Sequence, residues 1–191
     1  GTQATGKILT SDASGNASIT AAQIDNGSSD YCGVQSIAVA PSTFNCTNLA
    51  PNASDLLISE YVEGSSNNKA IEIYNGTGAA VNLQDYALRI FTNGASSPSN
   101  GIILPNFSLA NGATYVIVNN GAGIITTYNL ISATVINFNG DDALALVKNP
   151  TTTTTGGIFV DIFGRIGEDP GTAWVNLPNT TLDATLRRKS T

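Results

Sequence analysis

The sequence contains no histidine and no methionine, and its 191 residues include only two cysteines and one tryptophan. Without histidine the chain lacks the commonest general base and the commonest ligand of transition metals. This absence excludes Ser–His–Asp and Cys–His catalytic sets. No apolar run approaches the roughly 20 residues that span a bilayer, so we expect no membrane insertion.

Charge is also scarce. Charged residues make up 12% of the chain, about half the usual share in soluble domains. The formal net charge is −6, and the eight basic residues are scattered. Nucleic-acid binding needs a clustered Lys/Arg footprint on the phosphates, so nucleic acid is not an expected partner. Asn, Ser, Thr and Gly must instead cover much of the surface.

The two cysteines, Cys32 and Cys46, lie in a polar, strand-like context. A disulfide between them would restrict the unfolded chain and stabilise a segment with little core, although two free thiols are the alternative because spacing does not establish geometry. Together with the low charge, the cysteines favour an extracellular or cell-surface location. The chain shows no signal-peptide pattern, so we expect a mature or excised piece of a longer protein.

Short runs of alternating apolar residues, separated by Gly, Asn and Pro, predict an all-β sandwich. The expected strands are 17–19, 35–39, 56–62, 70–74, 86–91, 102–104, 114–119, 134–138, 143–148, 158–164 and 185–188. Asn-Gly pairs suit the tight reversals between them. The tract "NPTTTTTGG" (149–157) is expected to form an exposed hairpin tip.

A change of pattern near "NLAPNASD" (48–55) predicts a boundary between a short β segment, residues 1–50, and a β-sandwich, residues 51–191. The first segment has about four strand-length runs, whereas a sandwich usually needs about seven. We therefore expect residues 1–50 to pack against another domain or another molecule, since an unpaired strand edge can pair with a strand of a further chain.

The stretch "LLISEYVEGSSNNKAIEIYNGTGAAVNLQDYALRI" (56–90), followed by "NFNGDDALALVK", "VDIFGRIGEDPGTAW" and "TLRRK", resembles a lamin-tail domain. It is more closely similar to the bacterial form found in large secreted and surface proteins, often beside nuclease or adhesin modules. The resemblance spans roughly 55–189 and implies an immunoglobulin-like β-sandwich. Residues 11–49 resemble the first half of a repeat in exported proteins, many of them type 9-secreted, whose two cysteines are similarly placed. The usual later strands of that repeat are absent after Leu49.

The turn "FNGDD" contains the candidate metal ligands Asn139, Asp141 and Asp142. Oxygen ligands suit Ca²⁺, but these three residues supply fewer than the six to eight ligands it takes. Asp at a strand entry also commonly accepts hydrogen bonds from backbone N–H groups. Two adjacent side chains on a strand point to opposite faces. The structural turn is the favoured interpretation, and Ca²⁺ is the alternative.

Glu60 and Glu72 each lie in a strand with apolar alternate positions. A half-buried carboxylate needs a partner, so we expect structural ion pairs with basic residues, which include Arg187 and Arg188. Acid/base hydrolysis by two carboxylates is a distant alternative. Catalytic residues and cofactors are therefore not predicted.

The predicted function is a non-catalytic structural or adhesive module that contacts other modules or copies of itself. One alternative is a fibre subunit that exchanges β-strands through residues 1–50. Another is an accessory glycan- or substrate-binding domain of a larger secreted enzyme such as a nuclease.

Overall fold

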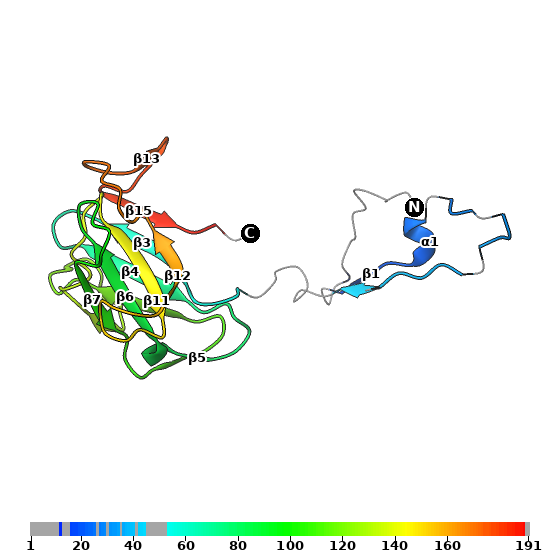
Figure 1. Ribbon diagram of the computed structural model, residues 1–191, viewed down its shortest axis with the longest axis horizontal. Coiled ribbons are helices and arrows are strands. Elements are labelled where there is room, and N and C mark those ends of the chain that lie inside the picture. Colours follow the sequence, from blue (N-terminus) through cyan, green and yellow to red (C-terminus); the bar gives the residue numbers. More distant parts are fainter. Residues whose placement is uncertain are drawn as a thin grey trace. The chain divides into compact units, whose positions relative to one another are not determined.

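Alternating apolar and polar residues in strand β3 (Leu57–Glu63) and strand β4 (Lys69–Tyr74) form a sheet with one buried face. A computed structural model of the chain (Figure 1) describes residues 12, 16–25, 27–29, 31–34, 36–40, 42–44 and 53–189. The chain divides after Pro51 into two compact units, and the larger one runs from Asn52 to Ser190.

Two sheets build the larger unit (Figure 1). The five-stranded sheet has the order β10-β9-β4-β3-β15, where β9 is Thr114–Val118, β10 Leu130–Ile131 and β15 Ala184–Arg187. The four-stranded sheet has the order β12-β11-β6-β7, where β6 is Tyr86–Phe91, β7 Asn100–Ile103, β11 Ala143–Lys148 and β12 Ile158–Phe163. Pairing is antiparallel except between β9 and β10.

Short elements complete this unit. The strand pairs are β5 (Val81–Asn82) with β8 (Ser108–Leu109), and β13 (Val175–Asn176) with β14 (Asn179–Thr180). A 3-10 helix, Leu83–Asp85, leads into β6, and Asn82 caps it by accepting the N–H of Gln84. No helix in the described part of the chain has the length and hydrophobicity needed to cross a membrane.

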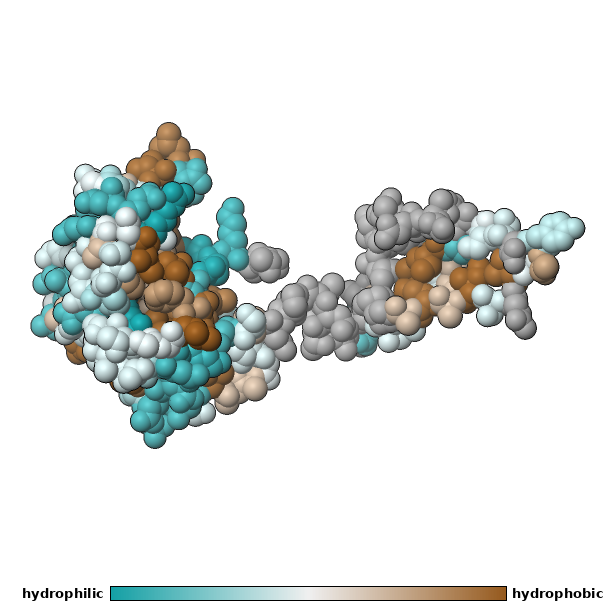
Figure 2. All heavy atoms as spheres, viewed as in Figure 1, coloured by the Kyte–Doolittle hydropathy of each residue, from teal (hydrophilic) through white to brown (hydrophobic). Residues whose placement is uncertain are grey.

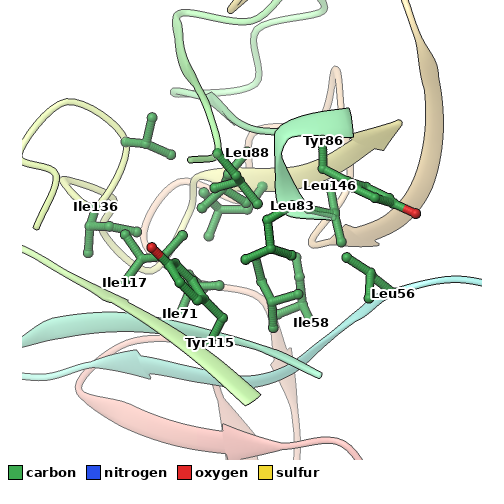
Figure 3. Close-up of a cluster of buried hydrophobic side chains, with 14 of the residues drawn as sticks. Leu56, Ile58, Ile71, Leu83, Tyr86, Leu88, Tyr115, Ile117, Ile136 and Leu146 are labelled. Carbon is green, nitrogen blue, oxygen red and sulfur yellow. The ribbon is translucent and has the colours of Figure 1, made fainter. Parts of the chain in front are cut away.

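The core lies between the two sheets (Figure 3). Ile58, Ile71 and Ile117 of the five-stranded sheet meet Leu88 and Leu146 of the four-stranded sheet. Burial of such side chains contributes about 1.5–3 kcal/mol each. The all-β, immunoglobulin-like sandwich predicted from the sequence is thereby confirmed.

The outer face of the four-stranded sheet is also covered. All six residues of β6 are buried, as are five of the six in β11. Phe91, Ala143, Ala145 and Val147 form a second apolar cluster on this face, against which Ile166 and Trp174 pack. Central strands buried on both faces lose their alternating pattern.

Seven expected strands coincide with β3, β4, β6, β9, β11, β12 and β15 within one or two residues, and β1 (Ala17–Ser18) and β7 overlap two more. The strand predicted at 134–138 is wrong. Val135, Ile136 and Phe138 are fully buried, but they lie in an irregular segment. A hydrogen bond from the Ile136 N–H to the Ser132 carbonyl closes its turn. The apolar run reflects a core-filling loop rather than a strand.

In the smaller unit, β1 pairs antiparallel with β2 (Thr43–Phe44), and a short helix α1 covers Ala21–Ile24. The strand predicted at 35–39 is not present in its described residues, 36–39. Ile19 is the one buried apolar side chain among the described residues of this unit, whereas Val34 and Ile37 are each 43% exposed. A segment with so few core contacts cannot hold a regular strand there by packing.

Candidate functional site

The Asp141–Asp142 turn connects two loops at the start of β11. The Oδ1 atom of Asp142 accepts the N–H of Asn93 at 3.0 Å, and its Oδ2 atom accepts the N–H of Asn139 at 3.0 Å. Both oxygens of this carboxylate are therefore engaged with backbone donors. The structure brings Asn139 and Asp142 together, and their contact is the one expected of a structural turn.

Asp141 lies in a different environment. Its side chain is buried, and its Oδ1 atom has no hydrogen-bond partner. Burial, then the nearby charges of Asp142 and Asp169, raise the pKa of the Asp141 carboxyl. Within the described ranges, no group of three or more Cys, Asp or Glu residues is placed to hold a metal ion. The contacts of Asp142 are those of a structural turn, and a Ca²⁺ site at this turn stays a prediction.

Glu60 and Glu72 lie directly opposite each other on β3 and β4. Glu60 Oε2 accepts the Arg187 Nε–H at 2.9 Å, and Glu72 Oε1 accepts the Ser59 hydroxyl at 2.8 Å. The Arg187 side chain is 76% exposed, so this ion pair contributes little to stability. The two carboxylates share a sheet face. The ion pair predicted for Glu60 forms with Arg187, whereas Glu72 is bound by the Ser59 hydroxyl in place of the predicted basic side chain.

Arg188 joins the edges of the two sheets. Its guanidinium binds both Asp161 carboxylate oxygens at 2.6 and 2.8 Å and donates from Nε to the Ile58 carbonyl at 3.0 Å. Asp161 in turn accepts the Ile58 N–H at 2.7 Å. Because Asp161 belongs to β12 and Ile58 to β3, this network closes one side of the sandwich.

A buried ion pair, Glu63–Lys69, was not anticipated. The two residues face each other across the β3–β4 hairpin, and Lys69 Nζ donates to Glu63 Oε1. The second Glu63 oxygen accepts the Asp183 N–H, and the ammonium lies 6.0 Å from the centroid of the Phe138 ring. Glu63 lies two residues after the buried Tyr61 in β3, so both side chains point to the same face of the sheet. This spacing could have predicted from the sequence that Glu63 is buried.

Arg89, located on β6, is also buried. Its guanidinium donates to the backbone carbonyls of Thr152, Thr153, Thr155 and Gly156 at 2.6–3.3 Å. Burial lowers the pKa of this side chain. As predicted, the 149–157 tract connects β11 to β12 and most of its residues are exposed. The hydrogen bonds from Arg89 hold this tract against the outer face of the four-stranded sheet.

Comparison with protein-family models finds a match to the Lamin Tail Domain over residues 50–167, more than half of the chain. The chain belongs to the lamin tail domain family. No curated protein matches it. The matched range of the lamin tail domain ends after β12, whereas β15 completes the five-stranded sheet beyond it.

The predicted Cys32–Cys46 disulfide of the segment before the lamin tail domain is not formed. Cys32 is an exposed free thiol, and Cys46 lies outside the described residues. A bridge requires the two Cα atoms to lie within about 7 Å with suitably directed Cβ vectors, which sequence spacing does not determine.

Hollows occur on the described surface of the lamin tail domain beside β15 and beside the β13–β14 hairpin. One, of about 170 Å³, is lined by residues of β3, β12 and β15, which include Tyr61, Phe163 and Leu186 together with Glu60 and Arg187. The other, of about 440 Å³, lies beside the β13–β14 hairpin and is lined in part by Trp174.

Large apolar side chains are exposed at several places, which include β12 and the β13–β14 hairpin. Ile158, Phe159 and Ile162 on the edge strand β12 are 63%, 52% and 41% exposed. Leu177, at the tip of the β13–β14 hairpin, is 86% exposed. Figure 2 shows the projecting hairpin tip as an apolar protrusion. Contiguous exposed apolar patches, unlike single exposed residues, are typical of contact surfaces.

Proposed function

We propose that this lamin tail domain is a non-catalytic structural and adhesive module of a secreted or cell-surface bacterial protein. The proposal rests on the state of its carboxylates. Glu60 pairs with Arg187, Glu72 accepts the Ser59 hydroxyl, and Asp142 holds two backbone N–H groups. Carboxylates with these partners support the fold and are poorly placed to exchange protons with a substrate.

The surface supports the adhesive part of the proposal. Few charges and many amide and hydroxyl side chains cover the chain, while apolar residues on β12 and at the β13–β14 tip are open to solvent. The low-charge composition and the resemblance of residues 11–49 to a repeat of type 9-exported proteins favour an extracellular location.

The test compares the parent chain with the Glu60→Gln/Glu72→Gln variant. Both are incubated with DNA, a phosphate ester and aryl glycosides, in the presence of Mg²⁺ or Ca²⁺. We expect no turnover above the buffer blank from either protein. Turnover by the parent that the variant loses would overturn the proposal. In parallel, labelled protein is expected to bind saturably to bacterial cell envelopes or polysaccharide-coated surfaces.

Strand exchange between copies is a second candidate function. The observation that favours it is the scarcity of core in the N-terminal unit, where Val34 and Ile37 are exposed and Ile19 is the single buried apolar residue of the described part. Such a unit gains stability if its strands add to a neighbouring molecule.

Light scattering after size exclusion, over a wide range of concentrations, tests this second candidate. We expect assemblies that grow with concentration and that weaken when Val34 and Ile37 are both replaced by Ser. A monodisperse monomer at the highest concentration would rule out the fibre.

A further inference from the structure

The hollow beside the β13–β14 hairpin is an open surface depression that is large enough for a small molecule. Its volume is about 440 Å³, within the roughly 300–1,000 Å³ of ligand pockets. The hairpin stands out from the body of the domain in Figure 1 and forms one wall. The segment after β12, including Gly164 and Arg165, and the ring of Trp174 also line it.

Trp174 is held in place by the residues around it. Its backbone N–H donates to the Thr181 hydroxyl at 3.0 Å, and its carbonyl accepts the Thr181 N–H at 3.2 Å. The benzo edge of the indole lies over Gly164, where an added Cβ would come within 2.8 Å of Cζ3 and Cη2. The ring also packs against the cluster that contains Ala143. It is thus a fixed aromatic wall.

The other walls mix polar residues with the apolar Val175 and Leu186, and they carry no net charge. Asn176 and Asn179 face each other in register across the hairpin, so both side chains lie on one side of it. Both residues line the hollow, together with Thr180. Arg165 and Glu168, also in the lining, neutralise each other at 3.1 Å. Amides and hydroxyls can donate and accept hydrogen bonds at the same site.

We propose that this hollow binds a neutral saccharide unit. An indole ring offers a broad apolar surface to the C–H face of a pyranose, and the asparagine amides supply paired donors and acceptors for its hydroxyls. A neutralised lining disfavours a charged ligand, which would be desolvated without a counter-charge. The inference deepens the adhesive function proposed above and rests on it.

Trp174 is the one tryptophan of the chain, so its fluorescence reports directly on this hollow. The full chain is titrated with D-glucose, D-galactose, D-mannose, N-acetyl-D-glucosamine, lactose and cellobiose, with D-glucuronate as the charged comparison. We expect a saturable change in emission with at least one neutral sugar. Asn176→Ala and Asn179→Ala, both at exposed hairpin positions, should each weaken binding about threefold to tenfold.

Asn120→Ala is the matched control, because Asn120 is exposed and lies outside the lining of the hollow. The sugar affinity of this variant should equal that of the parent protein. The inference is overturned if no sugar gives a saturable change, if the two hairpin variants bind like the control, or if glucuronate binds more tightly than the neutral sugars. A negative titration would refute sugar binding in this hollow but not the proposed non-catalytic function. Carboxylate-dependent turnover would refute that proposed function and would say nothing about the hollow.

Discussion

Replacing Lys69 by Met should destabilise the lamin tail domain strongly. The Lys69 and Glu63 side chains are 10% and 5% exposed. The substitution retains most of the apolar stem of the side chain but leaves the Glu63 carboxylate buried without a cation. Removing one partner of a buried ion pair costs about 3–5 kcal/mol, a large share of the roughly 5–15 kcal/mol that stabilises a domain.

Urea unfolding, followed by Trp174 fluorescence and circular dichroism, measures this loss. With a slope of about 1–3 kcal/mol per molar urea, the midpoint should fall by roughly 2 M. The double variant Glu63→Gln/Lys69→Met removes both charges and should lose less stability than Lys69→Met alone. This pattern separates charge burial from loss of packing.

The matched control is Glu168→Gln. Its Arg165 partner is 72% exposed and Glu168 itself is 48% exposed, so breaking this ion pair should change the free energy of unfolding by less than about 1 kcal/mol. If Lys69→Met unfolds within 1 kcal/mol of the parent, or matches Glu168→Gln, the Glu63–Lys69 pair is solvated and the reasoning is wrong.

Three further predictions concern other charges. Burial opposes ionisation of Asp55, but its bonds to Lys148, Tyr86 and its neighbouring backbone lower its pKa, so Asp55→Asn should cost about 1–2 kcal/mol at pH 7. Equilibrium unfolding should show this deficit beginning to shrink as the pH falls to about 4, where the carboxyl is protonated in the unfolded chain, and disappearing only below the lowered pKa of the folded carboxyl. Asp141 has a raised pKa, so its ionised form weakens the fold; Asp141→Asn should therefore stabilise the domain by about 1 kcal/mol at pH 7, with a gain that shrinks as the pH falls, and an equal gain at pH 4 and pH 7 would contradict the assignment. Arg89→Met should release residues 150–157, and limited proteolysis should cut there at least several times faster than in the parent.

The fold was largely predictable because its signals are local. Ile71 and Ile73 alternate with Glu72, and this period of two specifies a strand with one buried face. The buried strands β6 and β11 were also found, since runs of β-forming apolar residues bounded by turns are recognisable without alternation. The 134–138 segment was mistaken for a strand because its apolar residues satisfy the same pattern while filling the core as a loop.

The candidate sites were less predictable. The Asp142 turn could be read from strand-entry chemistry, which involves neighbouring residues and a short loop. The partners of Arg89 could not be predicted, because they are four backbone carbonyls of a distant loop, and such groups have no sequence signature. Nor could spacing reveal that Cys32 is a free thiol.

The sequence by itself determined most of the strands, many of the turns and the absence of histidine, since these depend on residue type and on neighbours along the chain. Tertiary structure alone decided which charges are buried and which loop covers the outer face of the four-stranded sheet. It also decided that Trp174 lines a hollow together with Asn176 and Asn179. Those features depend on contacts between residues far apart in the chain, and such contacts exist only once the two sheets have packed.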